Sequence, residues 1–148
     1  GSGSAEPLRE AARALDAGQL IAVLPQGTIP RGRAFFDPVL KGRSGAARLA
    51  AMTGAPVVPV GIWGTERVWP RSARLPRVTN VLSPPTVRVR VGPPVALGLG
   101  DPRADTEAMM DAIVALLPAE ARRVVEPTAE EIARALPPGA RVDAASPA

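Results

Sequence analysis

The stretch LIAVLPQGTIPRG, residues 20–32, decides the expected fold. Its first five residues, 20–24, form a short, continuous apolar run, which is typical of a strand covered on both faces in a parallel or mixed sheet. The run ends in PQGT at residues 25–28, where a glycine and a hydroxyl would lie at the carboxyl end of the strand. Because α/β folds commonly bind ligands at that end of a sheet, the stretch predicts a strand followed by a binding loop.

Helix and strand signals alternate on both sides of this stretch. Apolar residues recur at helical spacing over 6–16, and a second helix is expected from Ser44, a residue type that suits a helix cap, to Met52. The segment APVVPVGIWG then supplies an apolar strand around 57–62. This alternation is the α/β pattern, so we expect a mixed sheet flanked by helices.

The C-terminal part of the chain adds one strand and two helices to the pattern. Residues 86–91 alternate valine with arginine, which predicts a strand with its valines inward and one wet face. A helix is expected over 106–117, with Asp105 as its cap and an apolar stripe that packs in the core. Thr128 and Glu131 have capping-box spacing, which predicts a short helix before a tail.

The composition fits a single domain and excludes some kinds of functional site. The chain has 148 residues, of which 46% are apolar, and no apolar run approaches the roughly 20 residues that cross a bilayer. It has no cysteine, which excludes disulfides and thiolate zinc sites, and we expect no metal site. All of its 18 cationic residues except Lys41 are arginine, and the net charge is +4. Arginine is well suited to binding phosphate, but a GC-rich genome also encodes arginine in preference to lysine. Charge alone therefore supports an anionic partner only weakly.

Cationic side chains follow the PQGT turn. They belong to Arg31, Arg33, Lys41 and Arg43, and they could converge on a phosphate through charge-assisted hydrogen bonds. Most turns of this kind are simply turns, and most loop arginines are solvated. The physical pattern by itself therefore leaves both a binding loop and an ordinary surface loop open.

Three blocks in register resemble a known family. LPQGTIPRG is followed by VLKGRSGAARLA and then by GAPVVPVGIWGT. In this order and spacing they resemble the second half of the 1-acylglycerol-3-phosphate acyltransferases, the PlsC-type glycerolipid acyltransferases. The counterparts of the family's blocks are residues 24–28, 41–47 and 55–60, and the resemblance extends from about Leu8 to Leu117.

The resemblance implies transfer of a fatty acyl group in phospholipid biosynthesis. The acyl donor would be a thioester of coenzyme A or acyl carrier protein, the acceptor would be the free hydroxyl of a lysophospholipid, and no cofactor is expected. In the family, a glutamate-glycine-threonine-arginine block helps to hold the phosphate of the acceptor. Carried over to this chain, the expected substrate-binding residues are Gln26, Gly27, Thr28, Arg31 and Lys41.

The chain departs from the family pattern in its catalytic block. The family uses a histidine four residues before an aspartate as the base, and this sequence contains no histidine. We therefore assign no catalytic residue and expect residues 6–117 to be the C-terminal half of an incomplete acyltransferase domain, whose N-terminal half is a missing partner. Residues 1–5 are interpreted as a linker or expression remnant, and 118–148 as a short helix and mobile tail. A half-domain should leave a sheet edge and apolar surface uncovered.

Two further departures lie in the turn. Gln26 stands where the family has glutamate, which keeps the shape and hydrogen bonding of the side chain but removes its charge. Ile29 stands where the family has arginine after the threonine. We expect Arg31, two residues further on, to take over that role.

Tryptophan and arginine gather after the third block. Trp63 and Trp69 lie beside Arg67, Arg71, Arg74 and Arg77, a combination that suits an anionic membrane surface. A surface loop with tryptophans tucked into the core explains the same residues. With the family resemblance, the pattern predicts a peripheral protein on the cytoplasmic face of the membrane.

Two other functions remain open from the sequence. The chain could be a non-catalytic lipid- or phosphate-binding module that kept the pocket and lost the chemistry. A basic nucleic-acid-binding module ranks lower, because the aromatic content is only 3% and no nucleic-acid-binding motif is present. We expect no nucleic-acid partner.

Overall fold

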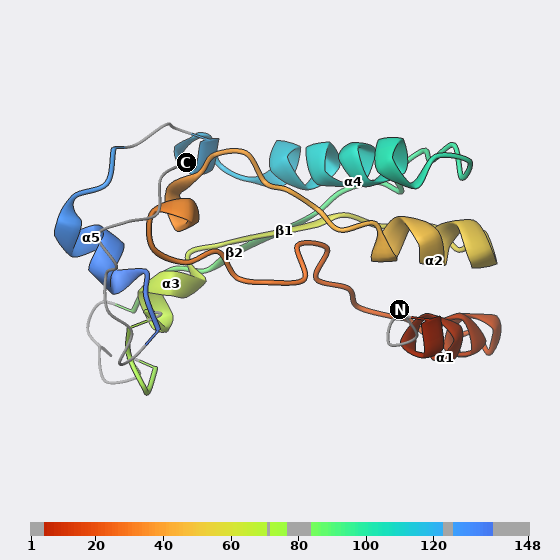
Figure 1. Ribbon diagram of the computed structural model, residues 1–148, viewed down its shortest axis with the longest axis horizontal. Helices are drawn as coiled ribbons and strands as arrows, with labels where there is room; N and C mark the ends of the chain where they lie inside the picture. The colour runs from red at the N-terminus through yellow and green to blue at the C-terminus, as the bar shows by residue number, and fades with distance from the viewer. Residues whose placement is uncertain (1–4, 71, 77–83, 123–125, 138–148) are drawn as a thin grey trace. The chain divides into compact units, whose positions relative to one another are not determined.

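Short helices make up most of the regular structure in the computed structural model (Figure 1), which describes residues 5–70, 72–76, 84–122 and 126–137. In chain order the elements are α1 (Ala5–Asp16), the 3-10 helix η1 (Gly32–Phe36), α2 (Gly45–Thr53), β1 (Val60–Trp63), α3 (Thr65–Val68), β2 (Arg88–Val91), α4 (Pro102–Leu116), the 3-10 helix η2 (Ala119–Arg122) and α5 (Ala129–Arg134).

The chain divides into two units, each formed from separate segments. Unit 1 consists of Gly1–Gly27, Leu40–Val60 and Val91–Leu116. Unit 2 consists of Thr28–Val39, Gly61–Arg90 and Leu117–Ala148.

In unit 1, α2 packs against both α1 and α4 (Figure 1). The buried centre is formed by Ala47 and Ala50 of α2 with Met109 of α4. Alanine has the smallest side chain that still favours a helix, so α2 can approach α4 closely while Met109 fills the space between them. The predicted core role of the α4 stripe is thereby confirmed for Met109.

The two helices on either side of the PQGT turn form where the sequence predicts them. Helix α1 confirms the helix expected over 6–16, and α2 confirms the one expected from Ser44 to Met52. Ser44 occupies the position before α2, but its side chain makes no capping hydrogen bond. Gly54 ends α2 in the left-handed conformation, with its N–H donating to the carbonyl of Ala50 at 2.8 Å.

The strand expected at 20–24 is not formed. These residues have no regular secondary structure, and Leu20 and Leu24 are 89% and 86% exposed. A strand exists only when a neighbouring strand pairs with its N–H and carbonyl groups, and among the described residues only β1 and β2 pair into a sheet. The apolar run therefore has a strand's composition without a strand's partner.

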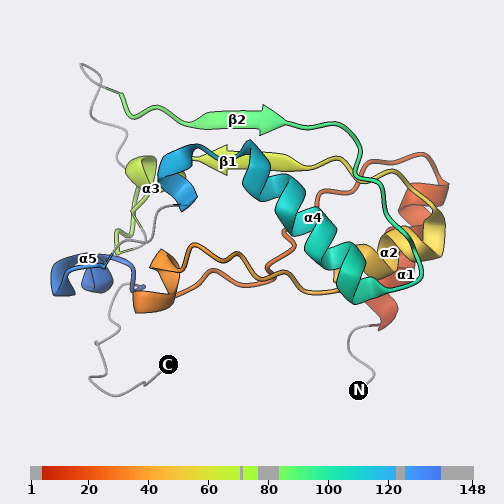
Figure 2. The same ribbon diagram turned by 90° about the horizontal axis from the view of Figure 1, so that it is seen from above.

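The sheet is a two-stranded antiparallel ribbon of β1 and β2 (Figure 2). These strands confirm the two expected around 57–62 and over 86–91, with shifted ends. The helices and this ribbon are compatible with the α/β class, but the described residues do not form the expected mixed sheet flanked by helices. The expectation that the valines of 86–91 face inward is also wrong, since all four residues of β2 are exposed and Val89 is 59% exposed.

Helix α4 begins earlier than the sequence indicates. Pro102 is its first residue, because the fixed φ of proline and its missing N–H suit the first turn of a helix. Asp101 takes the capping role instead of Asp105, and its Oδ1 accepts from the N–H of Arg103 at 2.8 Å. Asp105 lies inside the first turn, 4% exposed, where its Oδ1 accepts from the N–H of Gly98 at 2.8 Å.

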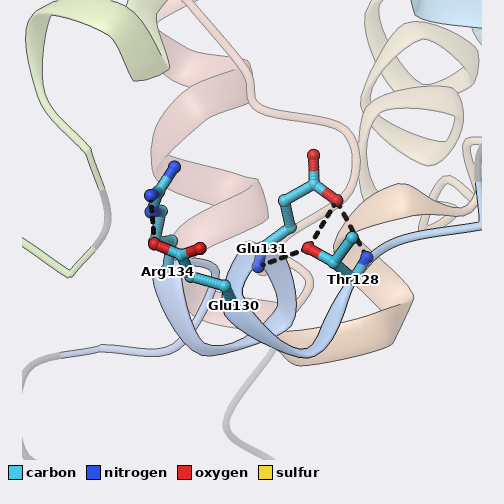
Figure 3. A network of polar contacts seen from close by, with 4 residues as sticks. All are labelled: Thr128, Glu130, Glu131 and Arg134. Carbon is cyan, nitrogen blue, oxygen red and sulfur yellow. Dashed lines mark hydrogen bonds and ion pairs between the residues drawn. The ribbon is translucent and has the colours of Figure 1, made fainter.

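In unit 2, α5 carries the capping box that the sequence predicts (Figure 3). The N–H of Glu131 donates to Oγ1 of Thr128 at 3.3 Å, and the N–H of Thr128 donates to Oε2 of Glu131 at 2.8 Å. Glu130 and Arg134, which lie one turn apart on the same helix, form an ion pair. The tail expected after α5 falls largely on residues 138–148, which lie outside the described residues.

The capping box makes α5 sensitive to acid. Hydrogen bonds from the backbone and side chain of Thr128 favour the ionised carboxylate and lower the pKa of Glu131. A lowered pKa means that the stabilisation is complete above the unfolded-state pKa and is lost as the pH falls through the folded-state value. We expect the amide resonances of Thr128 and Glu131 to report this acid transition in NMR spectra. E131Q should abolish the transition and E10Q, on α1, should leave it intact; a transition that survives in E131Q would contradict the assignment.

Candidate functional site

The PQGT turn is fixed to the segment that leads into α2. The N–H of Gly27 donates to the carbonyl of Leu24 at 3.0 Å, which closes the turn. The N–H of Arg43 donates to the carbonyl of Pro25 at 2.8 Å. This second bond joins residues 18 positions apart in the sequence, so it holds the turn beside the start of α2 in the absence of a surrounding sheet.

Arg43 lies directly across Gly27. The backbone of Gly27 has a φ of +65°, and a Cβ at this position would lie 2.8 Å from Cδ of Arg43 and 3.2 Å from its Nε. Only glycine combines this conformation with such a close approach at low cost. The turn thus presents its backbone to the stem of an exposed arginine.

The start of α2 adds positive character to the same place. The first N–H groups of a helix have no partner within it and carry the positive end of its dipole. Here they follow immediately after Lys41 and Arg43, which are both exposed. Backbone donors, an arginine and a lysine are the groups that bind phosphate or carboxylate at a helix N-terminus.

A hollow of about 280 Å³ opens in unit 1 between α1, the turn and the start of α2. It is lined by Pro7, Leu8, Ala11, Ile21, Val23, Leu24, Pro25, Gly27, Arg43, Gly45, Ala46 and Leu49. Arg43 is the one charged residue among the described residues that line it, and the other walls are almost entirely apolar. The hollow can therefore accept an apolar group that carries an anion at one end.

The five residues predicted to bind substrate fall in both units. Gln26, Gly27 and Lys41 belong to unit 1, where Gln26 is half-buried and Lys41 is exposed. Thr28 and Arg31 belong to unit 2, and both are exposed. Their role in substrate binding stays a prediction.

Sequence reasoning counted Arg43 among four cations but did not select it. Its contact with Gly27 depends on the positive φ of the glycine and on the bond to Pro25, which link positions far apart in the chain. The spacing of charges along the sequence contains no signal for either. The PlsC-like pattern drew attention to Lys41 instead.

The tryptophan and arginine cluster is described in part. Trp69 is 55% exposed and its indole N–H donates to the carbonyl of Ala73 at 3.0 Å, whereas Trp63 is half-buried. Arg67 and Arg74 are exposed. Two further arginines that the sequence places in this cluster, at 71 and 77, lie outside the described residues, and membrane contact stays a prediction.

Within the described ranges, no group of three or more histidine, cysteine or acidic side chains gathers into a metal-binding cluster. The same part of the chain has no helix with the length and apolar character needed to span a bilayer.

Residues 2–63 match the family model described as Acyltransferase. The matched segment contains the turn, the Lys41 block and the strand that follows α2, so the resemblance to acyltransferases is confirmed up to residue 63. Comparisons with curated proteins and with solved structures gave no significant match. The segment supports acyl transfer in general, while the resemblance expected for 64–117 stays a prediction.

The contact between Arg43 and Gly27 can be tested by adding a methyl group. Gly18 serves as the control, because it also has a positive φ, +76°, but an added Cβ would meet nothing within 4 Å. We expect G27A and G18A each to lose about 1 kcal/mol of unfolding free energy from backbone strain. Only G27A should shift the Nε–Hε resonance of Arg43, and equal Arg43 shifts in the two variants would contradict the contact.

Proposed function

We propose that this chain contributes the acceptor-binding part of a glycerolipid acyltransferase. The reaction would move a fatty acyl group from acyl-coenzyme A or acyl carrier protein to the free hydroxyl of 1-acylglycerol-3-phosphate or a related lysophospholipid. The proposal is supported by the acyltransferase match over residues 2–63 together with the arrangement of the turn in unit 1.

A single observation carries the proposal, which is the position of Arg43 at the edge of an apolar hollow. A lysophospholipid combines one acyl chain with one phosphate. The walls of the hollow suit the chain by apolar burial, and Arg43 with the first N–H groups of α2 suits the phosphate. Lys41 and Gly27 belong to the same unit and would complete the phosphate contacts.

Gln26 changes the electrostatics of this turn. A carboxylate at this position would compete with the phosphate for the neighbouring cations, and an amide does not. At the same time the amide cannot orient an arginine through an ion pair. In this chain the bond from the N–H of Arg43 to the carbonyl of Pro25 holds the arginine's backbone instead.

The catalytic base would come from outside this chain's own residues. Removing the proton of the attacking hydroxyl needs a group that titrates near neutral pH, and the sequence has no histidine to supply it. We propose that the N-terminal half of the same domain provides a His-x4-Asp block. The complete protein would act on the cytoplasmic face of a membrane, where its anionic lipid substrates reside.

A non-catalytic lipid- or phosphate-binding module is the second candidate. The same hollow and the same Arg43 would then bind a lipid phosphate without acyl transfer. Release of coenzyme A from acyl-coenzyme A by the native polypeptide, dependent on added lysophospholipid, separates the two functions, because only the enzyme produces it.

The binding role of Arg43 predicts a specific loss in R43Q. Short-chain lysophosphatidic acid, used below its micelle concentration, should bind the wild-type chain and lose about tenfold in affinity in R43Q, equivalent to about 1.4 kcal/mol. R48Q is the matched control, because it removes the same charge from an exposed residue of α2 that does not line the hollow. Calorimetric titration measures both affinities.

Monoacylglycerol of the same chain length provides the second control. It lacks the phosphate, so R43Q should leave its affinity within about twofold of the wild-type value. An equal loss of lysophosphatidic acid affinity in R43Q and R48Q would mean that the loss comes from the change in net charge alone. That result would contradict a phosphate site at Arg43.

A further inference from the structure

Helix α2 contributes Gly45, Ala46 and Leu49 to the wall of the hollow in unit 1. Residues three and four apart lie on the same side of a helix, so Leu49 shares its side with both small residues. The rise of an α-helix puts Leu49 about 6 Å further along the axis than Gly45. Arg43 precedes the helix, so the order along this wall, starting from the arginine, is glycine, alanine and leucine.

Gly45 borders open space. It is half-buried, yet a Cβ at this position would meet no atom within 4 Å outside its chain neighbours and its own helix backbone. The glycine three residues earlier is different, because a Cβ at Gly42 would lie 2.7 Å from Cγ2 of Thr106 and 2.8 Å from Cγ of Met110. Close packing against α4 therefore requires the glycine at 42, whereas no neighbour requires the one at 45.

The backbone does not require a glycine at position 45 either. Gly45 is the first residue of α2 and is not among the glycines with a positive φ. Any residue can adopt its conformation, and alanine is favoured over glycine in a helix. Its one structural effect is the space that it leaves open beside the hollow.

We propose that Gly45 is the specificity-determining residue of the hollow, because its missing side chain leaves the path from Arg43 along α2 open to an acyl chain. This inference rests on the proposed function and describes the substrate class more closely, as a phosphate ligand that carries an acyl chain. A chain whose phosphate lies at Arg43 passes residue 45 before it reaches Leu49, which is buried.

The size of the hollow makes this position sensitive. Its volume of about 280 Å³ is close to the lower end of the range for ligand pockets, which begins at about 300 Å³. A few added carbon atoms would therefore take a considerable part of the available space. A side chain at 45 would exclude the acyl chain and leave the guanidinium of Arg43 in place.

Three ligands separate the role of Gly45 from that of Arg43. Short-chain lysophosphatidic acid has both an acyl chain and a phosphate, monoacylglycerol has the chain alone, and glycerol 3-phosphate has the phosphate alone. A side chain at 45 should weaken the two ligands that carry a chain. Loss of the Arg43 charge should weaken the two that carry a phosphate.

The test compares G45V with G100V in the full chain. Valine is chosen because its branched side chain has one strongly preferred rotamer in a helix and cannot swing out of the path. Gly100 is the matched control, because it belongs to unit 1, does not line the hollow, and has no atom closer than 4.0 Å to an added Cβ. Calorimetric titration measures the two acylated ligands, and the Arg43 Nε–Hε resonance reports glycerol 3-phosphate.

The expected result is selective for the acyl chain. G45V should bind lysophosphatidic acid and monoacylglycerol about tenfold more weakly and keep its glycerol 3-phosphate affinity within about twofold of the wild-type value. G100V should match the wild type for all three ligands. Should G45V fail to fold, G45A adds a single methyl group that the backbone accepts, and the same selective loss is expected at reduced size.

Three results would overturn the inference. An unchanged lysophosphatidic acid affinity in G45V would mean that the ligand does not use the space at residue 45. An equal loss for all three ligands would place the obstruction at the phosphate instead of the chain, and equal losses in G100V would remove the specificity for this position. Failure of the wild-type chain to bind lysophosphatidic acid, or an R43Q variant that binds it normally, would instead reject the proposed function.

Discussion

The hydrogen bond from the N–H of Arg43 to the carbonyl of Pro25 is the interaction on which the candidate site depends. It joins the turn at Gly27 to the start of α2, and it does so without help from a sheet on either side of residues 20–24. Through it, three features meet in unit 1, which are a glycine turn, a helix N-terminus and an apolar hollow with an arginine at its edge. Each is common alone, and their combination suits a lipid phosphate.

Exposed apolar residues fit an incomplete domain. Leu20 and Leu24 are almost fully exposed, and the valines of β2 are exposed as well. In a complete α/β domain such residues lie within a sheet covered by helices, where burial of each leucine or valine stabilises the fold by about 1.5–3 kcal/mol. Their exposure here fits the proposal that another part of the acyltransferase covers them.

Local signals predicted the helices well, because their causes lie within a few residues of one another. The periodicity of α1, the glycine that ends α2, and the capping box of Thr128 and Glu131 each act over one or two turns. The start predicted for α4 lies four residues after the observed one, because Pro102, which suits the first turn of a helix, begins it. The strand at 20–24 failed for a non-local reason, because the composition of a strand cannot supply the neighbour that it needs.

The candidate site was likewise predictable only in part. The turn and Lys41 were selected from the family pattern, whereas Arg43 was found only through its contact with Gly27. In unit 2, the N–H of Gly32 donates to the carbonyl of Ala135 about 100 residues away, and no spacing in the sequence indicates this bond.

The most direct measurement is a crystal structure of the chain with short-chain lysophosphatidic acid bound. The phosphate is expected to lie within hydrogen-bonding distance of the Arg43 guanidinium and the first N–H groups of α2, with the acyl chain in the hollow beside α1. A phosphate bound elsewhere, for example on the exposed Arg88 and Arg90 of β2, with the hollow empty, would contradict it.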